Sequence, residues 1–296
     1  MTPGPELTAS LPPVSVVICC RNSASTLADT LDAVARQEYG GWWEVVVVDN
    51  GSTDDTAAVA RRFESRVPNL RIAPVPNPGH QARALNVGIR ESKSDILVLL
   101  DSDDEVGPDY LVHMAKALER HDFVGAAMDV TRLNPPELVG RRGQIQVDGI
   151  DSFCGYLPAV VGAAMGVRRE PIERIGGFDE NLPTQHDLDI SWRLAAAGVE
   201  PAFVPDATLH YRYRPSARAT FRQEFGYGDG EVVLFRTFRA AGMRRRTVPR
   251  VLVSWARIVL ALPGLRHPGG DVRLATMLGI NLGRLRGSLR YRTFYP

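Results

Sequence analysis

Residues 95–104 read DILVLLDSDD, an apolar run followed at once by three carboxylates in four positions. The run is short and apolar without alternation, which is typical of a strand buried on both faces of a sheet. Carboxylates this close repel one another unless a cation or hydrogen-bond donors lie between them, and their oxygens suit a hard divalent ion that also contacts substrate phosphates. The same residues are compatible with a helix N-cap, in which Asp103 or Asp104 caps a helix that begins at 108–111.

Three further strands precede this one, and helices separate them. The predicted strands are 14–19 (VSVVIC), 44–48 (EVVVV) and 70–75, and the predicted helices cover 27–35, 53–63 and 81–92. Strands that alternate with helices of this length imply right-handed crossovers and a mainly parallel sheet covered on both faces. We therefore expect an α/β fold with a Rossmann-like sheet flanked by helices.

Polar residues follow each strand at the edge where ligands bind in such sheets. They are Asn22, then Asp49 and Asn50, then 77–81, then 101–104. The sequence contains neither G-x-G-x-x-G nor G-x-x-x-x-G-K-[ST], so neither a dinucleotide fingerprint nor a P-loop explains the sheet. Four polar clusters on one rim indicate a binding crevice.

The second half of the chain alternates less regularly. We expect strands at 123–130 and 160–167, a helical turn at 171–175 and an amphipathic helix over 188–197. Within that helix Trp192 repeats at helical spacing with apolar neighbours, which favours core packing over sugar stacking. Beyond residue 221 the pattern is helical, with basic stretches.

Charge is distributed unevenly along the 296 residues. The net charge is +1, yet residues 212–296 hold seventeen Arg and no Lys against four acids, a local charge of +13. Such a region suits an anionic surface or substrate; alternatively, its arginines pair with the acidic remainder of the chain. No recognition motif accompanies the charge, so we do not expect nucleic-acid binding.

The composition favours a cytoplasmic protein that touches the inner membrane face at most peripherally. Residues 1–13 lack the pattern of a signal peptide and should form a flexible N-terminus. The longest apolar run, 251–262, contains Arg257 and is shorter than the roughly 20 residues that span a bilayer. Three cysteines without metal-ligand spacing fit a reducing compartment. Apolar helices edged by Arg, such as 251–262 and 274–289, are typical of segments that lie in a membrane interface.

Five ordered segments together resemble the family 2 glycosyltransferases of the GT-A fold. The segments are 15–37 (SVVICCRNSASTLADTLDAVARQ), 45–56 (VVVVDNGSTDDT), 77–104 (NPGHQARALNVGIRESKSDILVLLDSDD), 162–182 (GAAMGVRREPIERIGGFDENL) and 186–198 (HDLDISWRLAAAG). The resemblance implies a catalytic domain over 14–215, with a nucleotide-sugar-binding half (14–105) and an acceptor half (106–215). A helical, Arg-rich C-terminal region (216–296) follows it.

On the donor side the resemblance assigns roles position by position. Asp101-Ser102-Asp103 matches the DxD motif, with Asp103 as the main ligand of a Mn²⁺ or Mg²⁺ ion and Asp101 nearer the ribose and the metal. Asp49 and Asn50 match an acidic pair that contacts the base, where two aspartates are more usual. The remaining donor positions are Cys19 and Arg21, which flank the base, and Arg83, near the diphosphate.

On the acceptor side the segment HDLD (186–189) matches the family's Glu-Asp-x-Asp, which makes Asp187 the base that takes the proton of the acceptor hydroxyl. Asp189 has an expected structural role as an acid at a helix N-terminus. His210 matches a metal ligand of some relatives, or is an ordinary packed histidine. The acceptor-edge positions are Gly177, Phe178, Asp179 and His186, the last standing where Glu is usual.

These matches imply an inverting transferase that moves a sugar from a nucleotide-sugar, in the first place a UDP-sugar, to a hydroxyl of a saccharide, lipid-linked or small-molecule acceptor. One base and one metal-held leaving group suffice for direct displacement, without a second nucleophilic carboxylate. One alternative is a nucleotidyltransferase of similar fold, which would want a Gly-rich basic loop where this chain has ICCRNSAST. The other is a non-catalytic module that binds sugar nucleotides.

Overall fold

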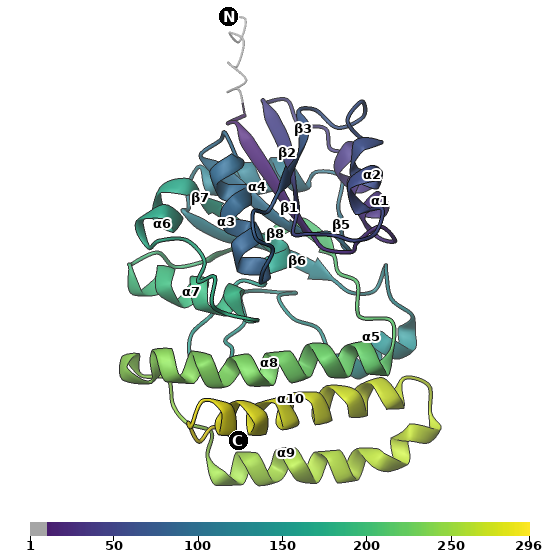
Figure 1. Ribbon diagram of the computed structural model, residues 1–296, viewed down its shortest axis with the longest axis vertical. Coiled ribbons are helices and arrows are strands. Elements are labelled where there is room, and N and C mark those ends of the chain that lie inside the picture. The colour runs from purple at the N-terminus through teal and green to yellow at the C-terminus, as the bar shows by residue number, and fades with distance from the viewer. Residues whose placement is uncertain (1–10) are drawn as a thin grey trace, which may run out of the picture.

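The computed structural model describes residues 11–296, and one eight-stranded sheet organises the part that precedes the last three long helices (Figure 1). The strands are β1 Val14–Cys20, β2 Trp43–Asp49, β3 Leu70–Pro74, β4 Ile96–Asp101, β5 Glu105–Val106, β6 Phe123–Asp129, β7 Met165–Arg168 and β8 Ala202–His210. Their order across the sheet is β3-β2-β1-β4-β7-β6-β8-β5. β7 runs antiparallel to both neighbours and β5 antiparallel to β8, whereas the other pairs are parallel. The predicted mainly parallel sheet is confirmed.

Strand register brings the functional rim together. β1 lies between β2 and β4, and its last residues pair with theirs: Cys20 with Asp49, and Cys19 with Asp101. All three strands are almost entirely buried, as their unbroken apolar runs predict. Because parallel strands end at the same edge, the polar residues that follow them meet there.

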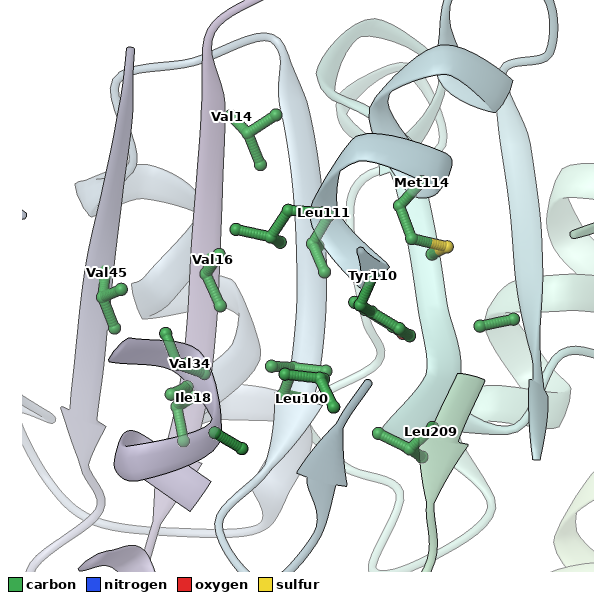
Figure 2. Packing of buried hydrophobic residues seen from close by; sticks show 14 of the residues in the cluster. Val14, Val16, Ile18, Val34, Val45, Leu100, Tyr110, Leu111, Met114 and Leu209 are labelled. Carbon is green, nitrogen blue, oxygen red and sulfur yellow. The ribbon is translucent and has the colours of Figure 1, made fainter. Parts of the chain in front are cut away.

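Helices cover both faces of the sheet. They are α1 Leu27–Ala35, α2 Thr56–Arg61, α3 Gln81–Glu91, α4 Tyr110–Leu118, α6 Arg169–Arg174 and α7 His186–Ala196, whereas α5 Pro136–Arg142 lies against the C-terminal helices. One core packs α1, α2 and α4 against the face of the sheet that bears Val16 and Ile18. Figure 2 shows the side chains of Val16 and Ile18 beside those of Val34 and Leu111. The other core packs α3, α6 and α7 on the opposite face. Burial of each such side chain contributes about 1.5–3 kcal/mol to stability.

The C-terminal region forms a helical layer beside the sheet domain, in the order α8, α10 and α9 moving away from it (Figure 1). These helices are α8 Ala217–Phe238, α9 Val248–Ala261 and α10 Gly270–Arg290, with short 3₁₀ turns η2 Arg239–Ala241 and η3 Leu262–Arg266 between them. Glycines let α8 and α10 approach closely, since a Cβ on Gly228 or Gly283 would overlap the backbone of the facing helix. Arg284 also forms two hydrogen bonds to Glu231 across this contact, of 2.7 and 2.8 Å.

Two local expectations from the sequence were wrong. The predicted strand 160–167 begins instead with the 3₁₀ turn η1 Gly162–Ala164, and only Met165–Arg168 forms β7. Asp103 and Asp104 do not cap a helix either. β5 follows them at once, and α4 begins at Tyr110 with Asp109 in the N-cap position. The carboxylates of Asp103 and Asp104 are therefore left free to form a site.

The expectation that no segment could span a bilayer also needs correction. The segment Val248–Arg266 is long and apolar enough by length and composition, with a mean hydropathy of 1.4 over its best window, only 6% of which is buried. The reason is that α9 continues through Leu262 and Pro263 into η3, which extends the apolar stretch beyond the interruption at Arg257. The predicted flexible N-terminus, 1–13, falls largely outside the described residues, and the domain boundaries stay an interpretation.

Candidate active site

A cavity of about 820 Å³ opens at the edge of the sheet where β1, β2 and β4 end. Six of the predicted donor-side residues line it, namely Cys19, Arg21, Asn50, Asp101, Ser102 and Asp103. Asp49 and Arg83, although both are described, do not line this cavity. Asp49 instead accepts the backbone N–H of Ser52 at 2.8 Å, which fixes the turn after β2. We call this space the donor cavity.

Three carboxylates gather at one wall of the donor cavity, which Asp101 and Asp103 line while Asp104 is buried behind them. Asp101, Asp103 and Asp104 each offer an oxygen, and these atoms lie within 4.8 Å of one another. Gln81 donates to Oδ1 of Asp101 at 2.7 Å. Oδ2 of Asp104 is buried with no hydrogen-bond partner among the residues that the structure describes. A carboxyl oxygen without a hydrogen-bond partner beside two further carboxylates fits a hard divalent cation, which prefers oxygen ligands.

Electrostatics favour a cation at the same place. Burial, reinforced by the charge of Asp103, raises the pKa of Asp101 to about 6. Burial also raises the pKa of Asp104 well above its usual range, with the charges of Asp103 and Asp101 adding to the effect. Burial and like charges thus oppose full ionisation of the three carboxyl groups. A bound cation would lower their pKa values and favour the ionised forms.

Two arginines that follow β8 contact residues of the carboxylate cluster. Nη1 of Arg214 lies 2.6 Å from Oδ2 of Asp103. Arg212 donates from its Nε to the carbonyl of Asp103 at 2.9 Å, and from its backbone N–H to Oδ1 of Asp104 at 2.7 Å. Both arginine side chains line the donor cavity. A guanidinium therefore already neutralises the side of the cluster that faces the cavity.

Asn50 stabilises the wall of the donor cavity opposite the carboxylates through hydrogen bonds to the loop 77–80. Its side-chain amide donates to the carbonyl of Gly79 at 2.9 Å and accepts the N–H of Gly79 at 3.0 Å. An aspartate could accept but not donate in this pair, so the departure from two consecutive aspartates has a structural reason. Arg21 reaches the same carbonyl at 3.4 Å, and its guanidinium is exposed. Asn50 and Arg21 thus brace the loop 77–80 beside the donor cavity.

Arg83 does not reach the carboxylate cluster. It pairs with Glu180 at 2.8 Å and donates to the carbonyl of Asn77 at 2.9 Å. Gln81, two residues earlier at the start of α3, occupies the position beside Asp101. Arg83 therefore ties α3 to the loop after α6.

A second cavity, of about 360 Å³, adjoins the first and contains the predicted base. Gln81, Asp101 and Arg214 line both cavities. Asp187 lies in the second one, where its Oδ2 accepts the N–H of Gly162 at 3.2 Å and its Oδ1 accepts the N–H of Leu188 at 3.0 Å. We call this space the acceptor cavity. It is closed on one side by residues of α8, namely Gln223, Glu224, Tyr227 and Glu231.

His186 lines the acceptor cavity next to the base. Burial lowers its pKa, with Asp187 acting in the opposite direction, so its imidazole is neutral near pH 7. Its ring packs edge-on against Phe178 at 5.7 Å. Phe178 itself is buried, and its backbone forms two hydrogen bonds of 2.9 Å with Asn86. The loop 177–179 does not line the cavity among the described residues; it supports His186 from behind.

Three other residues that the sequence singled out contact other protein groups and line neither cavity. Nδ1 of His210 lies 2.7 Å from Asp129, and the ring does not join the three-carboxylate cluster. Asp189 is buried and pairs with Arg193 at 2.7 Å, so its surroundings are those of a structural residue. Trp192 is 1% exposed and donates to the carbonyl of Leu157, which confirms core packing.

Two residues of the site were missed by sequence reasoning. Gln81 was predicted to begin a helix after the polar loop but was given no role in the site, and Arg214 was noted only as one of many arginines. A signal for Arg214 existed, because Arg212 and Arg214 alternate directly after a predicted strand, which aims both at the same side of the chain. The signal for Gln81 lay in its place at the first position of a helix that follows the rim.

Comparison with known proteins agrees with this geometry. The family model described as "Glycosyl transferase family 2" matches residues 15–176. The glycosyltransferase AglE of Haloferax volcanii is 28% identical over 229 residues, which cover 76% of this chain and 75% of that protein. A poly-beta-1,6-N-acetyl-D-glucosamine synthase of Staphylococcus epidermidis is 24% identical over 263 residues. The match covers 83% of this chain but only 63% of the synthase, so the chain spans less than two thirds of that relative.

Solved structures share the fold. The mannosyltransferase PcManGT from Pyrobaculum calidifontis, in complex with GDP-Man and Mn²⁺, superposes with a TM-score of 0.68 at 20% identity, covering 94% of this chain and 88% of that one. S. aureus TarS 1-349, in complex with UDP-GlcNAc, superposes with a TM-score of 0.56 at 15% identity, covering 96% and 93%. The expected GT-A-like architecture, a mainly parallel sheet flanked by helices with further C-terminal helices, is thereby confirmed.

Proposed function

The chain belongs to glycosyl transferase family 2, and from that premise we propose that it is an inverting enzyme that transfers a sugar from a UDP-sugar to an acceptor hydroxyl. As a family member it is a nucleotide-sugar-dependent glycosyltransferase, which removes the nucleotidyltransferase and the non-catalytic module from consideration. The observation that supports the finer proposal most strongly is the junction of the two cavities, where Asp101 and Arg214 line both. A donor on one side and an acceptor on the other would meet there.

The donor cavity would hold the nucleotide diphosphate at its acidic wall. Asp103 and Asp101 are the proposed ligands of a Mn²⁺ or Mg²⁺ ion, and Asp104 supports them with its orphaned oxygen. Such an ion, when bound, offsets the charge that develops on the departing diphosphate. Cys19, Arg21 and Asn50 would flank the base at the far end of the same cavity. Asp49 supports them through the turn after β2.

Arg214 is the proposed second cation for the diphosphate. Its guanidinium contacts Asp103 in the structure, and it lines both cavities. A planar guanidinium forms paired hydrogen bonds with phosphate oxygens. We therefore assign to Arg214 a role that the resemblance suggested for Arg83, which is committed to Glu180. His210, paired with Asp129, is left out of the proposed metal site.

Asp187 is the proposed general base. Backbone N–H groups of Gly162 and Leu188 hold one oxygen each, which fixes the plane of the carboxylate while it lines the acceptor cavity. The acceptor hydroxyl would give its proton to Asp187 as its oxygen forms a bond to the anomeric carbon. The bond from that carbon to the diphosphate oxygen breaks in the same displacement, and the configuration inverts. His186, which lines the same cavity with a neutral imidazole, would contact the acceptor.

The acceptor is proposed to be a hydroxyl compound of the saccharide, lipid-linked or small-molecule class. Residues of α8 close the acceptor cavity with amide, carboxylate and phenol groups, which suit a polyhydroxyl ligand. Three free cysteines fit the reducing interior of a cell, so we propose that the reaction occurs on the cytoplasmic side.

GDP-mannose is the second candidate donor. The fold likeness is greater to PcManGT, solved with GDP-Man, than to TarS, solved with UDP-GlcNAc, with TM-scores of 0.68 and 0.56. The direct test is calorimetric titration with UDP-, GDP- and TDP-sugars in the presence and absence of Mn²⁺, together with thermal unfolding. We expect one UDP-sugar to bind with Mn²⁺ and to stabilise the fold by about 2.7 kcal/mol at a hundredfold excess over its Kd. Tighter binding of GDP-mannose would replace the UDP assignment, and the failure of every donor to bind would overturn the proposal.

A further inference from the structure

The outer face of α9 presents several large apolar side chains to the surface. Leu252, Val259 and Leu260 are exposed to 64%, 64% and 78%. The opposite face is fastened to α10, where Ile258 is buried and Ser254 forms a 2.8 Å hydrogen bond with Asn281. In Figure 1 α9 is the helix farthest from the sheet, with α10 between it and α8. The apolar ridge therefore points away from the rest of the molecule.

Arginines border this ridge along one edge. Arg246, Arg250 and Arg257 line a shallow groove with Val253, and Arg244 and Arg245 line the adjoining hollow. Within residues 11–296 none of these five forms an ion pair with an Asp or Glu side chain, and Arg246 donates to the oxygen of Pro296 at 2.7 Å. The arginines of α10 differ: Arg284 pairs with Glu231, and Arg286 and Arg290 approach Asp229. The basic region thus contains an inner set that pairs with carboxylates within the fold and an outer set in which the exposed Arg250 and Arg257 can bind anions.

We propose that the face formed by Leu252, Val259, Leu260, Arg250 and Arg257 binds the surface of an anionic phospholipid bilayer, with α9 lying in the plane of the membrane. Aliphatic side chains would enter the region between headgroups and acyl chains, and the arginines would contact lipid phosphates. An apolar face edged by basic residues is the pattern of interfacial helices. Electrostatic attraction between these arginines and anionic headgroups increases the affinity for the membrane.

The geometry favours a helix that lies on the membrane over one that crosses it. Val248–Arg266 could cross a bilayer by length and composition alone, but a crossing helix would place Arg250 and Arg257 within the hydrocarbon region, where a charge is costly. The inner face of α9 is also committed to α10 through Ile258 and Ser254. A second copy of the chain fits the surface poorly. In a twofold dimer the same patch meets itself, so the unpaired arginines of both copies would face one another.

This placement also bears on the acceptor. The helical layer has α9 on one side, and on the other side α8 closes the acceptor cavity. Docking through α9 would hold the acceptor cavity above the bilayer, with the helical layer between them, so an acceptor tethered to a lipid would need a linker long enough to pass this layer. This extension rests on the proposed function, whereas binding of the bilayer does not.

Vesicle co-sedimentation of the full chain without nucleotide tests the docking surface. The vesicles are phosphatidylcholine alone, or phosphatidylcholine mixed with phosphatidylglycerol. We expect binding to the mixed vesicles only, weakened by raised salt. The double variant Arg250→Gln/Arg257→Gln should bind about 30-fold more weakly, since each basic residue near an anionic surface contributes roughly a fivefold gain. The variant Arg61→Gln/Arg62→Gln, which removes two exposed charges from α2, should bind like the parent.

The apolar ridge is tested by Leu252→Gln/Leu260→Gln, which should lower vesicle binding about tenfold or more even at low salt. Circular dichroism and calorimetric donor titration on the same samples show whether each variant is folded and whether the donor site works. Donor binding that is absent while vesicle binding persists would count against the proposed function alone. Parent protein that fails to bind mixed vesicles, or equal losses in the α2 variant, would overturn the docking surface. A parent dimer in sedimentation equilibrium that Leu252→Gln/Leu260→Gln converts to monomer would assign the face to a second copy instead.

Discussion

The two cavities of the site are built from different kinds of structure. The donor cavity lies on strand ends, where the ladder hydrogen bonds fix Cys19 opposite Asp101 and Cys20 opposite Asp49. The acceptor cavity depends on a helix start and a 3₁₀ turn, with Asp187 held by the backbone of Gly162. Sheet register positions the donor-side residues as a unit. The proposed general base, Asp187, is instead held by two backbone hydrogen bonds, from Gly162 and Leu188.

The two cavities also differ in charge. The donor wall concentrates three carboxylates and two arginines, which interact strongly with one another. The acceptor cavity also contains charged side chains, Glu224 and Glu231 among them, but there Asp187 lies beside a neutral imidazole. Changes on the donor wall should therefore alter binding of metal and nucleotide, and changes at Asp187 should alter transfer. The predictions below test that separation, beginning with the largest effect on binding.

Asp103→Asn should weaken Mn²⁺-dependent donor binding by at least about 100-fold. Loss of an outer-shell partner alone costs a metal site 10–100-fold, and Asp103 is proposed as a direct ligand. Calorimetry with the donor and Mn²⁺ measures the effect. Asp109→Asn, which neutralises an exposed carboxylate six residues away, is the control and should bind normally. Equal donor affinities for Asp103→Asn and Asp109→Asn would remove Asp103 from the metal site.

Arg214→Ala should change two affinities in opposite directions. Without nucleotide, Mn²⁺ should bind more tightly because the competing guanidinium has left Asp103. With Mn²⁺ present, the donor should bind about tenfold more weakly, since a hydrogen bond to a charged group contributes about 1.5–3 kcal/mol and this one is partly exposed. Calorimetry of Mn²⁺ alone and of donor with Mn²⁺ separates the two. The exposed Arg218→Ala is the matched control. Unchanged affinities in both titrations would refute the assigned role.

Asn50→Asp should destabilise the fold by about 1–3 kcal/mol, because the carbonyl of Gly79 loses its donor and faces a carboxylate. Urea unfolding measures the change. Asn77→Asp adds the same charge to an exposed position of the adjoining loop and should change the free energy of unfolding much less. If the two variants were equally stable, Asn50 would not brace the donor cavity as we describe.

The smallest effect concerns pH. The folded state lowers the pKa of His186 below its ordinary 6.5 by burial, so the unfolded state binds more protons in the window between the two values. Stability should therefore fall as pH decreases below 6.5. Urea unfolding from pH 7.5 to 5 should show a shallower decline for His186→Gln than for the parent. Parallel curves would mean that His186 is solvated.

Much of the donor cavity could be predicted from the sequence, because unbroken apolar runs locate the strands and the rim follows from their parallel order. Sequence alone could not foresee that Arg83 pairs with Glu180, which is 97 positions away. Nor could it show that Gly162 begins a 3₁₀ turn, since its Gly- and Ala-rich run is compatible with a strand. The two sets of arginines in the C-terminal region differ only in whether a carboxylate lies close to them. Packing of α8 against α10 supplies these carboxylates to the arginines of α10.

The most direct test of a divided site is Asp187→Asn, measured as transfer of sugar to a real acceptor rather than as donor hydrolysis. The account predicts that transfer falls by about 10²–10⁴-fold, the usual contribution of a positioned general base. It also predicts that calorimetric donor affinity with Mn²⁺ is unchanged, because the carboxylate lies in the acceptor cavity. Transfer at the parent rate, or a loss of donor binding that matches the loss of transfer, would contradict it.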